Sequence, residues 1–289
     1  MKKTFKVLSS FLFVGMLFSS LLITSCKDDP DPDPNAGKTD PSTIATTNLI
    51  AYFPFDGSGV ESIASITPRV TTGVTYVAGR RGKAYQGAVL AHLLYDLPGA
   101  SKLKTLKSFS IGMWLKSPLV TGDPEPTIFE IGKTDDLFWG NLKIVTQRLT
   151  ATADTLQLKA FFLKNGALWS GQHISYSNSA LLIDKWMHLV FEYDATTSKY
   201  KIYKDGMQIV TNAGVENRFS NEGVALGDLA FANADVINIG AWRPKSEGTA
   251  TDEWMGWFLG NLDELRVYDK ALNDTEVKAL YDAEVTWVE

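Results

Sequence analysis

From residue 48 onward, the chain alternates short apolar runs with polar breaks. The runs are rich in β-branched and aromatic residues, and clusters of Gly, Asn, Asp and Pro separate them. The first group of residue types favours strands, and the second favours turns. Many short strands at fairly even spacing predict an all-β sandwich or barrel. The clearest runs cover residues 49–55, 109–116, 156–163, 187–193, 200–203, 207–210, 236–239 and 262–268.

One hairpin can be placed from the pattern alone. Asp205-Gly206 lies between two alternating runs. Both residue types adopt the positive φ angles that a tight hairpin turn requires. Two longer polar stretches, residues 212–235 and 243–254, are predicted to be loops.

One segment near the C-terminus has the period of a helix. Asn273 can cap it, and Glu276 three residues later completes a capping-box-like pair. Val277 and the apolar residues three and four positions after it form one stripe. We therefore expect a short helix over about residues 274–282, lying across the sandwich.

The first 26 residues have a different pattern. Three lysines and no acid occur in the first six residues, and an apolar run follows over residues 11–23. Because a hydrocarbon core needs about 20 apolar residues, this run predicts a signal peptide and not a spanning helix. The sequence that ends at Cys26 resembles the bacterial lipobox, which implies cleavage before Cys26 and lipid on its thiol. The alternative is an ordinary secretory signal with an incidental cysteine.

The segment after Cys26 is predicted to be a tether. Cys26 is the only cysteine, so the exported chain forms no internal disulfide and depends on its core for stability. Alternating Asp and Pro make residues 27–47 stiff and solvated. Lys27-Asp28-Asp29 resembles the acidic export tag of some gram-negative bacteria, which implies an outer-membrane lipoprotein that faces outside. A plain acidic linker is the alternative.

Charge narrows the range of partners. The chain has 28 Lys plus Arg and 33 Asp plus Glu, and three of the lysines lie in the predicted signal peptide. Residues 27–289 therefore carry 25 − 33 = −8. This balance argues against nucleic acid or an anionic membrane surface as the partner.

The ordered motifs of the mature chain resemble a known family. They are LIAYFPFDGS, GRRGKAYQGA, SFSIGMWLKS, WMHLVFEYDATTSKYKIYKDGMQI, INIGAW and GNLDELRVYDKALNDTEVKALYDA. Together they resemble the laminin-G-like branch of the concanavalin A-like lectin/glucanase superfamily, over about residues 48–283. The resemblance implies one domain over residues 48–289, a jelly-roll sandwich of two antiparallel sheets with a short C-terminal helix. Residues 119–169 match less clearly, so the strand order there is left open.

The chain lacks the paired carboxylates of a hydrolase at their usual spacing. Glycosidases cleave with two carboxylates a few ångströms apart, and the retaining glucanases of this fold carry them as Glu-x-Asp-x-x-Glu, which this chain lacks. Adjacent acids such as Asp263-Glu264 should point to opposite faces of a strand. His92, His173 and His188 have no metal-ligand neighbours at a useful spacing. We predict a non-catalytic protein, with a divergent glycosidase or lyase as the less favoured alternative.

Calcium is the one cofactor that the resemblance implies. In laminin-G-like domains, an acid after the first strand and an acid of the last strand commonly meet at one ion. The matching residues are Asp56 and Asp263, and Glu61 occupies the place of a further family Asp. Calcium prefers such oxygen ligands, and its role here would be structural. The alternatives are a turn former for Asp56 and an ordinary sheet-edge acid for Asp263.

Loop tryptophans are the candidate ligand platform. A sugar site combines a flat apolar face with hydrogen-bonding neighbours. Tryptophans on loops can also be lids over the core. The candidates, at or near predicted loops, are Trp139, Trp169, Trp242, Trp254 and Trp257, with Asn141, Arg243 and Asp252 as polar groups.

These features predict a surface lipoprotein with a lectin-like domain that binds extracellular carbohydrate. The competing hypothesis is a protein-binding, adhesion or structural module of a surface complex. An exposed apolar patch over the sandwich would favour that alternative, and a polar groove would favour the glycan.

Overall fold

A computed structural model describes residues 33–118, 125–148, 154–164, 170–221 and 223–287. The predicted signal peptide, with Cys26, lies outside these ranges. The fold below is that of the unit from Pro34 to Glu289. Among the described residues, no helix has both the length and the apolar character that crossing a membrane would require.

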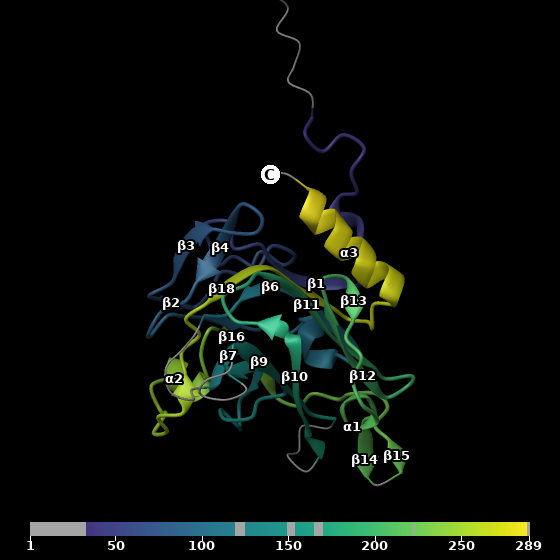
Figure 1. Ribbon diagram of the computed structural model, residues 1–289. Helices are drawn as coiled ribbons and strands as arrows, with labels where there is room; N and C mark the ends of the chain where they lie inside the picture. The colour runs from purple at the N-terminus through teal and green to yellow at the C-terminus, as the bar shows by residue number, and fades with distance from the viewer. Residues whose placement is uncertain (1–32, 119–124, 149–153, 165–169, 222, 288–289) are drawn as a thin grey trace, which may run out of the picture. The chain divides into compact units, whose positions relative to one another are not determined.

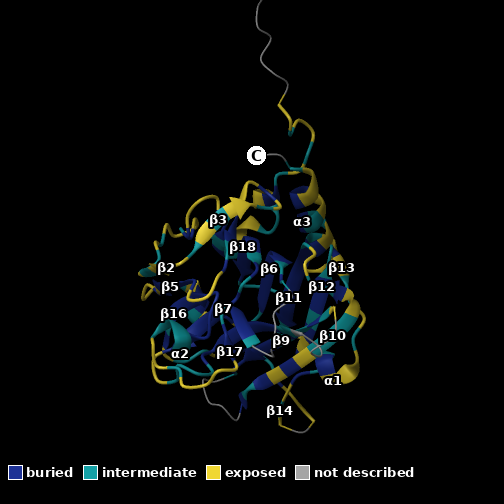
Figure 2. Cartoon of the chain, turned by 60° about the vertical axis from the view of Figure 1, so that its left-hand side comes forward, coloured by how far each residue is buried: buried dark blue, intermediate teal, exposed yellow. Residues whose placement is uncertain are grey.

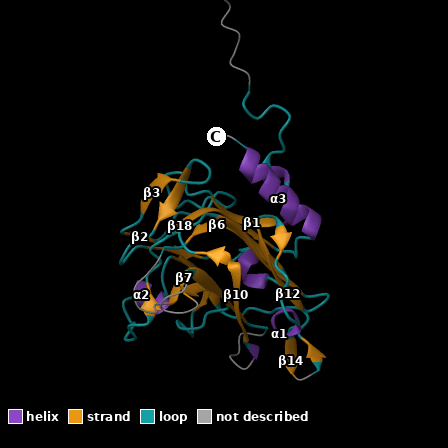
Figure 3. Ribbon diagram, viewed as in Figure 1, coloured by secondary structure: helices purple, strands orange, loops and turns teal. Residues whose placement is uncertain are grey.

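In the described part of the chain, strands predominate and form two sheets of eight strands each (Figure 3). Neighbouring strands are antiparallel, except that the short β17 (Met255–Gly256) runs parallel to β7. The prediction of two antiparallel sheets is confirmed. In spatial order the first sheet contains β13 (Met207–Gln208), β12 (Lys199–Lys204), β11 (Met187–Asp194), β6 (Phe109–Lys116), β18 (Asn261–Tyr268), β4 (Lys83–Gln86) and β3 (Thr75–Ala78), with β1 (Leu49–Phe53) also on β18.

The second sheet continues the sandwich with strands from the middle of the chain. Its order is β10 (Gln172–Leu182), β9 (Thr155–Phe162), β8 (Leu142–Arg148), β7 (Glu125–Lys133), β16 (Ala234–Ile239), β5 (His92–Asp96) and β2 (Val70–Thr72). Strands β7, β8 and β9 are consecutive and adjacent, which settles the strand order that was open over residues 119–169.

The core lies between the inner faces of the two sheets. On β6, Phe109, Ile111 and Met113 join the core cluster, and the residues between them face the other side. Most strands are buried, whereas β3 at the edge of the first sheet is exposed (Figure 2). Each large apolar side chain that is fully buried contributes about 1.5–3 kcal/mol, so this interface dominates the stability of the fold.

Several predicted element bounds differ from the structure. The two predicted loops contain short elements: α1 (Ala213–Glu216) and the hairpin β14 (Phe219–Asn221) with β15 (Val224–Ala225) in the first, and α2 (Arg243–Ser246) in the second, while β16 already begins at Ala234, inside the first. The predicted tether also ends early, since η1 (Pro41–Thr43) and η2 (Thr46–Asn48) form there, and Ile44 packs on the cluster beneath α3. The remaining 3-10 turn is η3 (Lys102–Thr105).

A β-bulge in β18 overturns one expectation. The register slips between Asp263 and Arg266, and Glu264 has a φ of 53°. Leu262 and Leu265 both enter the core, so Asp263 and Glu264 lie together on the outer face. The alternation rule fails here because a bulge adds one residue to the strand.

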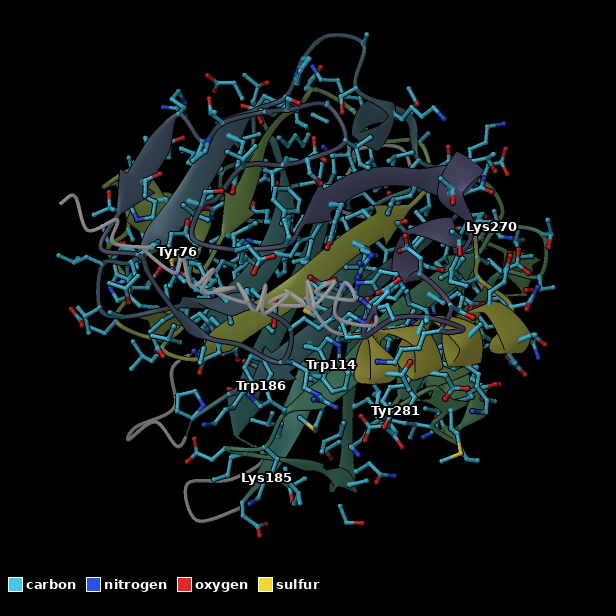
Figure 4. The ribbon with its side chains drawn as sticks, turned by 90° about the horizontal axis from the view of Figure 1, so that it is seen from above. Tyr76, Trp114, Lys185, Trp186, Lys270 and Tyr281 are labelled. Carbon is cyan, nitrogen blue, oxygen red and sulfur yellow. The ribbon has the colours of Figure 1, made fainter. Side chains whose placement is uncertain are left out.

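The predicted C-terminal helix is α3 (Asp274–Thr286), and its capping box is present. Val277 and Leu280 pack on the outer face of the first sheet, against Val190 and Tyr203. Viewed from above, Tyr281 of α3 lies beside Trp114 of β6 (Figure 4), with 5.8 Å between ring centroids. The helix therefore covers one outer face of the sandwich (Figure 1).

A buried ion-pair network fastens α3 to the sheet. Arg266 contacts Glu284 of α3, and its Nη2 lies 2.6 Å from Glu264 Oε2. Trp114 Nε1 donates to Glu284 Oε2 at 2.8 Å. Burial lowers the pKa of His188 to about 3, so this imidazole is neutral beside Glu284. His188 is a buried residue of β11.

The network predicts which helix residue matters for stability. Glu284→Ala leaves part of the Arg266 charge uncompensated, and breaking a buried pair costs about 3–5 kcal/mol. We expect the thermal midpoint to fall by roughly 5–15 °C. Lys278→Ala is the matched control on the same helix, because its exposed pair with Asp282 contributes about 0.5 kcal/mol or less. Equal small shifts for both variants would contradict this account.

Candidate functional site

Aromatic side chains from distant segments line a cavity of about 220 Å³ on the outer face of the second sheet. We call it the aromatic pocket. Phe138 and Trp139 come from the β7–β8 connection, Trp242 precedes α2, and Trp254 precedes β17. The strands contribute the remaining residues of the pocket, which are Glu125, Lys143, Val145, Lys159, Ala160, Phe161, His173, Ile174 and Ser175.

Strand alternation explains why this face carries the site. On β8, Ile144 joins the core, so Lys143 and Val145 face outward. On β9, Leu158 and Phe162 enter the core, so Phe161 faces outward. The outer face of the second sheet therefore presents a mixed floor of apolar and cationic side chains, over which the loop aromatics close.

The rings support one another in a continuous series. Trp242 lies 5.1 Å from both Phe138 and Trp254 between centroids, and Trp139 lies 4.8 Å from His173. Trp242 is 4% exposed and forms the base, whereas Trp254 is 39% exposed. Edge and tilted contacts at these distances are favourable and fix the ring orientations. The rings of the pocket are thus held in place by one another.

A buried charge pair lies beneath the rings. Lys143 Nζ lies 3.8 Å from the Trp242 ring centroid and 3.5 Å from Glu130 Oε2, and it donates to the Phe138 carbonyl. Burial lowers the pKa of Lys143 and raises that of Glu130, and each charge opposes the shift of the other. The cation–π contact stabilises Trp242 in its place.

The rim of the pocket is tied to the first residue of β7. The Trp242 indole donates to the Glu125 carbonyl, and Glu125 N donates to the Trp254 carbonyl at 2.9 Å. The Glu125 carboxylate forms an ion pair with Lys159, and both side chains are about one quarter exposed. The pocket thus combines apolar faces with polar groups at its edge.

The structure brings together three of the predicted tryptophans, namely Trp139, Trp242 and Trp254. Trp257 does not line this pocket and packs 5.9 Å from the His92 ring. Trp169 lies outside the described residues.

The polar residues that were predicted to accompany the tryptophans lie outside the aromatic pocket. Arg243 is buried and forms two hydrogen bonds of 2.8 Å with Asp235, so it anchors α2. Asn141 is buried and bonds to Ala232 and Gly132. Asp252 is exposed and does not line the pocket. None of these three is among the described residues that surround the aromatic pocket.

Sequence reasoning missed the strand residues of the pocket. Phe161 belongs to a run whose inward and outward positions could not be assigned without the register, and His173 lies on β10, for which no run was predicted. Lys143 and Lys159 gave a usable signal, because lysine in an apolar strand marks the face directed away from the core.

The predicted calcium ligands are placed partly together. Asp263 Oδ2 accepts bonds from Arg80 N and Arg81 N at 2.7 and 2.9 Å, whereas its buried Oδ1 has no hydrogen-bond partner. Burial raises the pKa of Asp263 to about 8, and the nearby charges of Glu264 and Asp56 add to the rise. An orphaned oxygen in this setting fits a cation, with Asp56 as the second carboxylate.

The carboxylate of Glu61, the third predicted ligand, already has hydrogen-bond partners. Its carboxylate accepts backbone N–H bonds from Tyr52, Ile63 and Ala64 at 2.7–2.9 Å, which fixes the turn around it. Within the described residues, no group of three or more His, Cys, Asp and Glu is arranged to hold a metal ion. Both carboxylate oxygens of Glu61 already accept hydrogen bonds from the backbone.

The chain belongs to the concanavalin A-like lectin/glucanase superfamily, because the family model with that description, Laminin_G_3, matches residues 95–278. No curated protein sequence matches the chain. Among solved structures, the fold is similar to the binding domain of botulinum neurotoxin serotype G, with a TM-score of 0.55 and 16% identity over 81% of this chain and 50% of that one.

Two further solved structures are similar in fold to this chain. The serotype C1 binding domain gives a TM-score of 0.56 and 15% identity, over 83% of this chain and 53% of that one. The binding domain of botulinum neurotoxin DC in complex with SialylT gives 0.55 and 13%, over 84% and 52%. The chain thus spans about half the length of these domains, and at such identity the likeness shows the fold alone.

Proposed function

We propose that this protein is a non-catalytic, lipid-anchored surface protein that binds extracellular carbohydrate in the aromatic pocket. The observation that carries the proposal is the meeting of Trp139, Trp242 and Trp254, from three separate segments, around one cavity. Sugars present C–H faces that stack on aromatic rings and hydroxyls that bond to a polar rim. Glu125 and Lys159 supply such a rim.

The charges of the pocket favour binding over hydrolysis. Among the described residues that line it, Glu125 is the one acid, and it is paired with Lys159. Glu130 is fully buried behind Lys143. A hydrolase needs two accessible carboxylates at the scissile bond, and this arrangement offers one paired group.

The likeness to solved structures is compatible with a binding role. One similar structure is of a binding domain in complex with SialylT, and another is of botulinum neurotoxin type C, whose cell entry is dependent upon interaction with two ganglioside molecules. A third is in complex with rat synaptotagmin II, a protein. The competing hypothesis, a protein-binding or adhesion module, is therefore tested beside the glycan.

Trp254→Ala should weaken the binding of soluble polysaccharides to the purified domain by about tenfold or more, since it removes an exposed stacking face. Intrinsic fluorescence titration gives the affinity, and a reducing-end assay runs in parallel. Trp257→Ala is the matched control, because it removes a tryptophan outside the pocket and should leave affinity unchanged. Equal effects of the two variants would reject the pocket. New reducing ends would show a glycosidase, and silence across a broad glycan set would favour the protein-binding module.

We propose further that Cys26 is lipidated and anchors the chain in the outer membrane of a gram-negative bacterium, facing outside. The basic start, the short apolar run and the lipobox-like end of residues 1–26 support this. Cys26→Ser should move the protein from the membrane fraction to the soluble fraction, because the lipid thioether cannot form. A Cys26→Ser protein that stays with membranes would contradict the anchor. Protease treatment of intact cells tests the orientation, and an uncut protein would argue against exposure.

A structural calcium ion held by Asp56 and Asp263 is the last part of the proposal. The ion would supply positive charge to the buried, unpartnered Asp263 oxygen. Calcium should raise the thermal midpoint over the EDTA-treated protein by about 5–10 °C at saturating concentration. Asp56→Asn should abolish that calcium-dependent difference, whereas Glu61→Gln should lower both midpoints and keep it. A midpoint that does not respond to EDTA would exclude the ion.

A further inference from the structure

A second hollow of about 370 Å³ adjoins the aromatic pocket. His173 lines both spaces, so they meet at the edge strand β10. The other walls are Gly171, just before β10, Gln172 at its start, Asn217 and Arg218 from the turn between α1 and β14, and Phe219 at the start of β14. No acidic residue is among these described walls, and Phe219 is 47% exposed.

Arg218 in this hollow differs from the other buried arginines. In the described part of the chain, four arginines are buried, and three of them, Arg81, Arg243 and Arg266, form ion pairs with carboxylates. Arg218 is 8% exposed and forms no ion pair with any described residue. Its Nη2 donates to the Gly214 carbonyl, and its Nε has no acceptor.

A buried guanidinium without a counter-charge is costly, and proteins normally pair it. Burial lowers the pKa of Arg218, while the pKa of Arg243 and Arg266 is raised, because carboxylates surround those two. The planar fork of arginine matches a carboxylate, which it binds with two parallel hydrogen bonds. Arg218 therefore lacks a counter-charge among the described residues, and an anion of that shape would supply one.

We propose that this hollow is a second subsite, which takes a carboxylate-bearing sugar unit linked to a unit in the aromatic pocket. The ligand class is an acidic oligosaccharide that crosses β10 over His173, with its carboxylate on Arg218 and its ring against Phe219. This inference rests on the proposed function and adds to it the charge and the minimum length of the glycan. Asn217 offers an amide group for the hydroxyls of the second unit, whereas Gln172 Nε2 already donates to the Ser170 and Phe219 carbonyls.

Matched ligand pairs test the proposal on the purified domain. The probes are galacturonate and N-acetylneuraminate oligosaccharides, each beside its carboxyl-reduced counterpart, and a sulfated galactan beside its desulfated form. We expect at least one acidic probe to bind about tenfold or more tightly than its reduced counterpart. Arg218→Gln should remove that preference, and Arg218→Lys should keep only part of it. Arg69→Gln, which alters an exposed arginine next to the opposite edge strand β2, should leave the preference intact.

The outcomes separate this inference from the proposed function. Binding that Trp254→Ala weakens, without preference for the carboxylate and without an effect of Arg218→Gln, would overturn the subsite and leave the aromatic pocket in place. A preference for sulfate alone would overturn the carboxylate. Absence of binding to every probe, acidic and neutral, would count against both. Should Arg218→Gln fail to fold, the wild-type pairs and their salt dependence decide, since a charged contact weakens with ionic strength and a neutral one does not.

Discussion

The apolar interface between the two sheets is the constraint on which the structure depends. Cys26 is the only cysteine, so no disulfide supports the sandwich, and the inner faces must supply its stability. Because side chains alternate along a strand, every inward residue also fixes which neighbours face outward. The side chains that remain for binding are therefore those on the outer faces and in the loops.

The two outer faces both carry buried charged residues, and these residues are covered in different ways. On the first sheet, α3 covers the face, and Arg266, Glu264 and Glu284 neutralise one another beneath it. On the second sheet, no long helix is present in the described residues, and loop aromatics cover Lys143 and Glu130 instead. The separate loops leave the aromatic pocket between them, and for this reason the proposed binding site lies on the second sheet.

Alternating runs and the capping box made helix α3 and most strands of the first sheet predictable, but not β3 and β4 at one edge of that sheet. Strands β7 and β8 were missed because polar residues such as Glu130 and Lys143 interrupt their apolar runs, although the fold buries these side chains. Loop position was enough to nominate Trp139, Trp242 and Trp254, yet it could not separate them from Trp257, because strand pairing decides which loops meet. The bulge at Glu264 and the pairing of Arg243 with Asp235 depend on tertiary contacts that no local pattern encodes.

The pocket walls come partly from strands and partly from loops, and this affects how the sequence of such a domain can vary. The floor of the pocket, which includes Lys143 and Phe161, belongs to inner strands of the second sheet, whereas Phe138, Trp139 and Trp254 lie on connections between strands. Loops tolerate substitution and insertion better than strands. The proposed ligand preference can therefore change, in evolution or by loop grafting, while the framework keeps its stability. One sandwich can then carry many different binding sites.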